Sequence, residues 1–66
     1  MGAAIDVNAV NAAGDTALHA AARMNYPAVA RMLVAAGARF DVRNRKGETP
    51  LAVASGDQVR KALGEA

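Results

Sequence analysis

The side chains that could carry chemistry in this sequence are few and scattered. His19 is the only histidine of the 66 residues, and cysteine is absent. Because histidine titrates near neutral pH without perturbation, His19 is the first residue to consider as a general acid or base. A serine nucleophile would require Ser55 and a carboxylate to converge on His19. The sequence alone gives no sign of such convergence.

The acidic residues do not fit a metal site either. Asp15, Asp41 and Asp57 lack the D-x-[DN]-x-[DN]-G spacing of a calcium-binding loop. A single histidine cannot build a zinc site without partners, and thiolate ligands are excluded by the lack of cysteine. The glycines are isolated, whereas a phosphate-binding loop clusters them. The sequence therefore predicts no metal, no cofactor and no enzymatic activity.

A basic segment, "RFDVRNRK" at residues 39–46, is the main charged feature. The charges before Arg39 balance, so the net charge of +2 comes from the C-terminal part of the chain and is concentrated in this segment. The segment is open to three interpretations: a solvated turn, a loop that contacts an acidic protein surface, or a nucleic-acid contact. A pI near 9.7 is compatible with nucleic acid. The small net charge and the lack of nearby aromatics other than Phe40 disfavour it.

The chain is short for an independently stable domain. A protein of 66 residues buries only about 60% of the surface that its unfolded form exposes. Disulfides and metals often compensate in small proteins, and since neither is predicted here, association with another molecule is the remaining remedy. No apolar run reaches the length of a membrane span, and the start "MGAAID" has no signal-peptide pattern. We expect a cytoplasmic protein.

The sequence repeats itself with a period of 33 residues. "GDTALHAAA" at 14–22 and "GETPLAVAS" at 47–55 begin alike. The aligned pairs are Gly14 and Gly47, Asp15 and Glu48, Thr16 and Thr49, Leu18 and Leu51, Ala21 and Ala54, and Asn11 and Asn44. So many matches around one glycine identify an internal repeat.

The shared residues suit a turn followed by a short helix. Glycine permits positive φ in the turn, an acidic residue suits the positive end of the helix, and threonine can cap its free N–H groups. Leu18, Ala21 and Ala22 then share one helix face. Pro27 begins a second helix and Gly37 ends it, with Asn25 in the turn between the helices. The unit is predicted to be helix–turn–helix–loop.

These motifs resemble the ankyrin repeat family. The family pattern combines G-x-T-P-L-H-x-A-A, a turn, a V-x-x-L-L helix, and G-A-D with a β-turn containing D-V-N-A. Similar stretches here are "GDTALHAAA", "AVARMLVAAGAR" at 28–39 and "DVNAVNAAG" at 6–14. The resemblance implies an all-α solenoid of stacked helix–turn–helix units joined by β-turn loops. Among the departures, Ala17 replaces the proline, Arg39 the aspartate and Ala52 the second histidine.

The number of repeats is irregular. About three residues are missing after Ser55 relative to the first unit, so the last helix is shortened, with one polar side. We expect residues 1–10 to be the tail of a preceding repeat, 11–43 a complete repeat and 44–66 a shortened C-terminal capping repeat. Because about three repeats are normally needed for stability, the chain is expected to be the C-terminal end of an array.

The expected architecture has four helices, near residues 16–24, 27–36, 49–55 and 58–64. They should form two stacked antiparallel pairs, with the loops projecting at right angles. Phe40 replaces a family valine and is expected to be packed. The missing preceding repeat should leave part of the first helical pair uncovered, at Ala17, Leu18, Ala21, Val29 and Leu33. This predicts self-association, or a partner docked on the N-terminal side.

The resemblance also implies roles for single residues. His19 lies within T-x-L-H and is expected to tie one repeat to the next by hydrogen bonds, while Ser55 lies in a linking turn where the family has no chemistry. Family members contact protein partners through loop tips and the exposed side of each first helix. We call the two loops the first finger (residues 10–15) and the second finger (residues 43–48). The implied partner-binding residues are Asp15, Arg23, Met24, Arg43, Arg45, Lys46 and Glu48.

Three functions remain compatible with the sequence. The first is a protein-interaction module without catalysis, whose partner presents an acidic surface to the second finger. The second is an assembly unit that associates with itself through its N-terminal face. The third is a basic helix–turn–helix that binds DNA, which is disfavoured because "PAVARMLVAAGA" is largely apolar. Met24 fits either partner contact or packing at the helix end.

Overall fold

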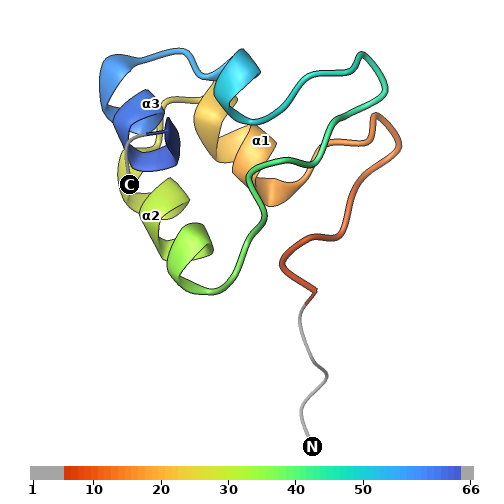
Figure 1. Ribbon diagram of the computed structural model, residues 1–66, viewed down its shortest axis with the longest axis horizontal. Coiled ribbons are helices and arrows are strands. Elements are labelled where there is room, and N and C mark those ends of the chain that lie inside the picture. Colours follow the sequence, from red (N-terminus) through yellow and green to blue (C-terminus); the bar gives the residue numbers. More distant parts are fainter. Residues whose placement is uncertain (1–5, 65–66) are drawn as a thin grey trace, which may run out of the picture.

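The protein folds into short helices and long loops in a computed structural model that describes residues 6–64. The helices are α1 (Ala17–Arg23), α2 (Pro27–Ala35), a short 3-10 helix η1 (Leu51–Val53) and α3 (Asp57–Gly64). Figure 1 shows two helical pairs, α1 with α2 and η1 with α3, packed side by side. The described residues contain no strand. The all-α, ankyrin-type architecture predicted from the sequence is confirmed.

Helix α1 begins with a complete capping box. The Thr16 hydroxyl accepts a hydrogen bond from the His19 backbone N–H at 3.3 Å, and the His19 ring accepts one from the Thr16 N–H at 3.0 Å. Two of the free N–H groups at the helix start are thereby satisfied. After Arg23 the chain turns through Asn25, whose φ of 58° is left-handed. Asparagine tolerates that conformation better than other non-glycine residues, as predicted.

Helix α2 also begins and ends where the sequence indicated. Pro27 is its first residue, where a missing N–H costs nothing. Gly37 follows the helix with φ of 98°. The Gly37 N–H bonds to the Val34 carbonyl and the Ala38 N–H to the Leu33 carbonyl, both at 3.0 Å. This is a Schellman motif, which requires a left-handed residue and therefore favours glycine.

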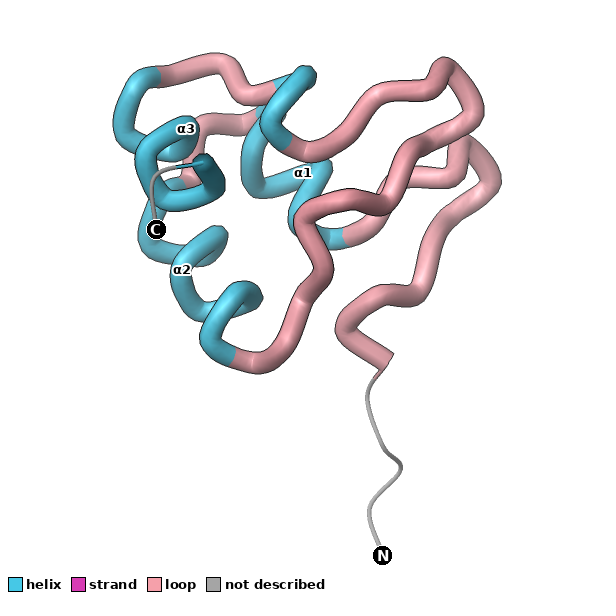
Figure 2. Tube along the Cα trace, in the orientation of Figure 1, coloured by secondary structure: helices cyan, strands magenta, loops and turns pink. Residues whose placement is uncertain are grey.

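The core is small and built largely from alanine. Its buried apolar residues come from both helical pairs and are Leu18, Ala21, Ala22, Ala30, Ala38, Val59 and Leu63. Small side chains let the helices approach closely, so α3 packs directly on α1 and α2. Figure 2 shows that the loops leave these helices on one side and run next to each other. No helix in the described part of the chain has the length and apolarity that crossing a bilayer requires.

The third predicted helix differs from the structure. Instead of an α-helix over 49–55, only Leu51–Val53 form a single 3-10 turn. The three residues that are missing after Ser55 correspond to Arg23, Met24 and Asn25, which end α1 and form the turn after it. The Ser55 N–H bonds to the Ala22 carbonyl at 3.0 Å and brings the chain straight to the end of α1.

Two predictions about burial are wrong in detail. Phe40, expected to be packed, is exposed. Leu18 and Ala21, expected to lack cover, are fully enclosed because η1 and α3 lie against α1. Ala17 and Val29 are exposed and Leu33 is half-buried, as expected for a first pair with an open side.

Candidate interaction surface on the stacked fingers

Each finger is closed by one asparagine side chain. In the first finger the Asn11 amide oxygen accepts from the N–H groups of Ala13 and Asp15 at 2.9 and 3.0 Å. In the second finger the Asn44 amide oxygen accepts from Lys46 and Glu48 at 3.0 and 2.9 Å. The repeated asparagine therefore has the same structural role in both fingers. Its side-chain oxygen accepts hydrogen bonds from two backbone N–H groups of the loop.

The two fingers lie against each other. The Arg45 backbone N–H donates to the Ala13 carbonyl at 3.0 Å. Gly14 lies at the contact with φ of 80°, and a Cβ added there would be 2.9 Å from the Arg45 nitrogen. Two independent reasons therefore favour glycine at position 14. Its backbone is left-handed, and the second finger leaves no room for a side chain.

Asn44 also joins the fingers through its amide nitrogen. This nitrogen donates to Asp15 Oδ1 at 2.9 Å and to Glu48 Oε1 at 3.0 Å. The Asn44 side chain therefore makes four hydrogen bonds, which is the full capacity of an amide group. Two carboxylates near the fingertips are held by these bonds within the molecule.

An ion pair completes this network. Arg23 Nη1 donates to Asp15 Oδ2 at 2.9 Å, with the Asp15 side chain only 11% exposed. The hydrogen bond from Arg23, followed by that from Asn44, holds the pKa of Asp15 below its ordinary value. The same pair raises the pKa of Arg23. Asp15 thus remains ionised at neutral pH and links α1 to both fingers.

The fingers and α1 enclose a cleft of about 440 Å³. Its lining residues are Ala13, Asp15, Arg23, Asn44, Arg45, Lys46 and Glu48. Of the seven residues predicted to bind a partner, the structure brings five together here and leaves out Met24 and Arg43. Met24 is exposed at the end of α1, so it does not pack there as the alternative interpretation required.

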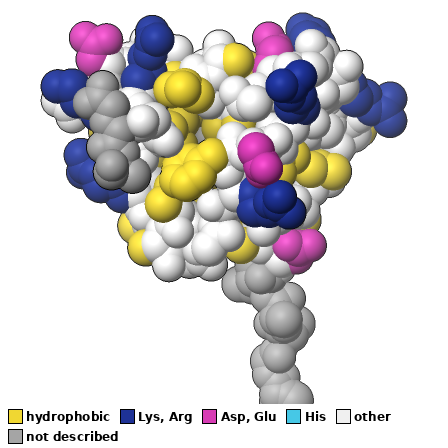
Figure 3. Space-filling view, in the orientation of Figure 1, with side chains coloured by type: hydrophobic (Ala, Val, Ile, Leu, Met, Phe, Trp, Pro, Cys, Tyr) yellow, Lys and Arg dark blue, Asp and Glu magenta, His cyan; other side chains and the backbone are white. Residues whose placement is uncertain are grey.

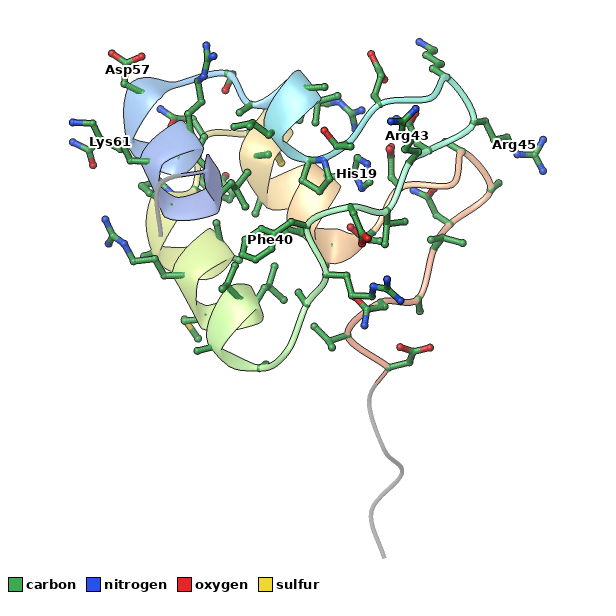
Figure 4. All side chains as sticks on the ribbon, in the orientation of Figure 1. His19, Phe40, Arg43, Arg45, Asp57 and Lys61 are labelled. Carbon is green, nitrogen blue, oxygen red and sulfur yellow. The ribbon has the colours of Figure 1, made fainter. Side chains whose placement is uncertain are left out.

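The positive charge of this region lies at the fingertip. Arg39 is paired with Asp41 at 3.2 Å, which lowers the pKa of that carboxyl. Arg43, Arg45 and Lys46 are exposed and have no ion-pair partner among residues 6–64. Figure 4 shows Arg45 at the far tip of the second finger, at the opposite side of the molecule from Asp57 and Lys61 on α3. Figure 3 shows lysine and arginine side chains along the rim of the molecule on both sides.

His19 lies behind the cleft and is completely buried. Because its Nδ1 accepts from the Thr16 N–H, the ring proton is on Nε2, which donates to the Glu48 carbonyl oxygen at 2.7 Å. Both ring nitrogens are thereby used to join α1 to the second finger. The predicted bond between repeats is present.

Sequence reasoning missed the central position of Asn44. The 33-residue alignment paired it with Asn11, but neither asparagine was assigned to the site. The available signal was that asparagine precedes each glycine by three residues, which is the spacing of a side chain that closes a tight turn. Its second set of bonds, to Asp15 and Glu48, depends on the stacking of the fingers and has no local pattern.

Comparisons with known proteins agree with this geometry. Residues 2–64 match the family model for ankyrin repeats, which describes three copies. An ankyrin repeat protein from Rickettsia bellii (strain RML369-C) is 43% identical over 58 residues, which cover 88% of this chain and 34% of that protein. The crystal structure of the ankyrin repeat domain of Bcl-3, a member of the IkappaB protein family, is similar with a TM-score of 0.85 and 36% identity.

The similarity extends over nearly the whole chain but over only part of the matched proteins. The chain spans about a third of the Rickettsia protein and 25% of the Bcl-3 chain. The chain belongs to the ankyrin repeat family, whose repeats are generally protein–protein interaction modules.

Proposed function

We infer that this chain is a non-catalytic protein-interaction module that presents the second finger and the neighbouring surface of α1 to an acidic partner in the cytoplasm. In this proposal residues 11–43 are a complete repeat, 44–66 a shortened capping repeat, and 1–10 the tail of a preceding one. The seven residues named from the family pattern form the contact surface, with Arg45 and Lys46 at its centre.

One observation carries the proposal. The carboxylates nearest the fingertip, Asp15 and Glu48, both accept hydrogen bonds from Asn44. Exposed Arg45 and Lys46 lie on the same rigid loop. Loops held by a rigid scaffold often carry binding functions. A solvated turn would not need its backbone held in one geometry. The fixed loop therefore supports the interpretation that Arg45 and Lys46 contact a partner more strongly than the interpretation as a solvated turn.

The cleft suits a side chain of the partner. It has a volume of about 440 Å³ and is open between the fingers and α1. A glutamate or aspartate that entered it would meet Arg45 and Lys46 at the tip and Arg23 at the base. Arg23 is half exposed and already bonded to Asp15, so the two fingertip cations would dominate recognition.

The test compares two double charge reversals. Arg45→Glu/Lys46→Glu changes the fingertip, and Arg60→Glu/Lys61→Glu is the matched control on exposed positions of α3. The probe is a glutamate-rich peptide with a fluorescent label, and a glutamine-rich peptide of equal length is the neutral reference. At low salt the fingertip variant should bind the acidic peptide roughly tenfold more slowly, because surface charges act mainly on association rates.

The outcome distinguishes the other interpretations. A smaller effect from the α3 variant supports a local contact, whereas equal effects from both variants would show only a response to net charge. An unchanged association rate in the fingertip variant would leave the second finger as a solvated turn. Tighter binding of random-sequence duplex DNA than of the acidic peptide, lost in the fingertip variant, would favour nucleic acid instead.

A further inference from the structure

The cleft between the fingers and α1 is lined by charges of both signs. Arg45 and Lys46 are exposed at the fingertip. Asp15 lies farther in, with a side chain that is only 11% exposed, and Glu48 is half-buried. The fingertip is therefore positive, whereas the inner end of the cleft contains two carboxylates.

These two carboxylates differ in how far their oxygens are used. Asp15 accepts a hydrogen bond at both oxygens, from Arg23 at Oδ2 and from Asn44 at Oδ1, each at 2.9 Å. Glu48 accepts from Asn44 at Oε1, at 3.0 Å. Within residues 6–64 the other oxygen of Glu48, Oε2, accepts no hydrogen bond and has no ion-pair partner. Glu48 can therefore accept a bond from a bound molecule without losing a bond of its own.

Arg23 is the cation that the inner carboxylates share. It is bonded to Asp15, and its pKa is raised mainly by Asp15 and to a smaller extent by the charge of Glu48. Because one arginine serves two carboxylates, one negative charge remains uncompensated at the inner end of the cleft. A purely anionic molecule would be attracted to the fingertip but repelled from this inner end.

We propose that the partner presents a lysine with acidic residues on either side of it. The lysine ammonium enters the cleft and donates to Glu48 Oε2, while the neighbouring acidic side chains contact Arg45 and Lys46 at the fingertip. This inference rests on the proposed function, since the acidic residues must first bring the segment to the second finger. It adds Glu48 as the residue that determines which acidic segments are preferred.

The size and lining of the cleft suit a lysine side chain. The volume of about 440 Å³ leaves room for it, and Ala13 is an exposed wall residue on which the lysine stem can pack. An ammonium group has three donors, so it can bond to Glu48 and still be hydrated from the open side. A nucleic acid has no cation to place at the inner end, and the negative charge there therefore favours a protein segment.

The test uses two labelled peptides that differ at one position. One has a lysine in the centre of a run of glutamates, and the other has a glutamine there. Attraction to the fingertip alone would make the lysine peptide bind more weakly, because it has less negative charge. Contact with Glu48 predicts the reverse. The Kd of the lysine peptide, measured by fluorescence anisotropy, should be about fivefold lower, which is the upper end for a partly exposed ion pair.

A pair of variants tests whether Glu48 is responsible. Glu48→Gln retains an oxygen for the Asn44 bond and leaves the backbone bonds of residue 48 in place, and a thermal melt checks its fold. The preference for lysine should disappear in this variant. Asp57→Asn makes the same change in net charge on α3, at the opposite side of the molecule from Arg45 (Figure 4), and should keep the preference.

The outcomes separate this inference from the proposed function. If neither acidic peptide binds more tightly than the glutamine-rich reference, the proposed function fails and this inference fails with it. If both acidic peptides bind the unmodified chain but the lysine peptide has an equal or higher Kd, only this inference is overturned, whether or not the variants fold. A lysine preference that persists in Glu48→Gln, or that Asp57→Asn also abolishes, overturns the assignment to Glu48.

Discussion

His19 and Thr16 join the first helix to the second finger through a small set of buried bonds. Thr16 caps α1, and His19 donates to the Glu48 carbonyl across the repeats. Asn44 makes the corresponding connection closer to the surface, through Asp15 and Glu48. At the residue scale, therefore, these buried polar groups join the helix to the fingers, while the side chains of Arg45 and Lys46 stay exposed.

Replacement of these connectors should lower stability. Thr16→Ala should cost about 1 kcal/mol through the lost cap. His19→Ala should cost roughly 1–3 kcal/mol, because it removes the bond to the Glu48 carbonyl and leaves the buried Thr16 N–H without its acceptor. Thr49→Ala is the matched control, since its hydroxyl accepts from Ala52 at 3.3 Å without a reciprocal histidine. Urea denaturation measures all three. A loss at Thr49 as large as that at His19 would contradict the assigned role.

The Asp15 carboxylate should make stability depend on acid pH. Its pKa is lowered in the folded state from 3.8 by Arg23 and Asn44. The stabilising contribution is then fully present above the unfolded pKa and is lost as the pH falls through the folded pKa. Thermal melts below pH 5 should therefore show a weaker acid dependence for Asp15→Asn than for the unmodified chain.

The control for this measurement is Asp6→Asn. Asp6 is exposed, and among the described residues its carboxylate accepts a hydrogen bond only from the nearby Asn8 N–H. Its replacement should therefore leave most of the acid dependence in place. An acid dependence that Asp15→Asn leaves intact would show that the ion pair with Arg23 does not hold the carboxylate ionised in solution.

At the scale of elements, the sequence predicted the parts with local signals. Gly37, Pro27 and Thr16 marked helix ends because each satisfies or avoids a specific backbone group. The length of the third helix could not be predicted from local patterns. It depends on a contact between the two units, in which the Ser55 N–H bonds to the Ala22 carbonyl near the end of α1. Exposure at Phe40 likewise depends on whether another repeat covers it. Local patterns therefore predicted where the helices begin and end. Burial of the side chains on these helices depends instead on how neighbouring repeats pack.

Contact between the fingers can be isolated with a pair of glycine substitutions. Gly14→Ala and Gly47→Ala both place alanine at positive φ, with a cost of about 1–2 kcal/mol. Only Gly14→Ala also brings a Cβ to 2.9 Å from the Arg45 nitrogen. Thermal unfolding at low protein concentration should therefore show a larger loss for Gly14→Ala. Equal losses would mean that the fingers are not in close contact in solution.

At the scale of the whole molecule, one fully covered interface holds two helical pairs together. A repeat array gains stability from each such contact between neighbours, and the alanine-rich core limits how much apolar surface a single contact buries. The sequence revealed the repeat, the family and five of the seven residues that line the cleft. It did not reveal that Leu18 would be fully enclosed while Leu51 is not, since both occupy the same position in the pattern.

Chemical-shift mapping by NMR tests most directly whether the second finger is the binding surface. The protein is titrated with the glutamate-rich peptide at low salt and at low protein concentration. The largest amide shifts should fall on residues 43–48 and on Ala12 and Ala13 of the adjoining finger, and they should shrink at high salt as the charges are screened. Shifts concentrated on α3, or shifts of equal size with the glutamine-rich peptide, would contradict the account.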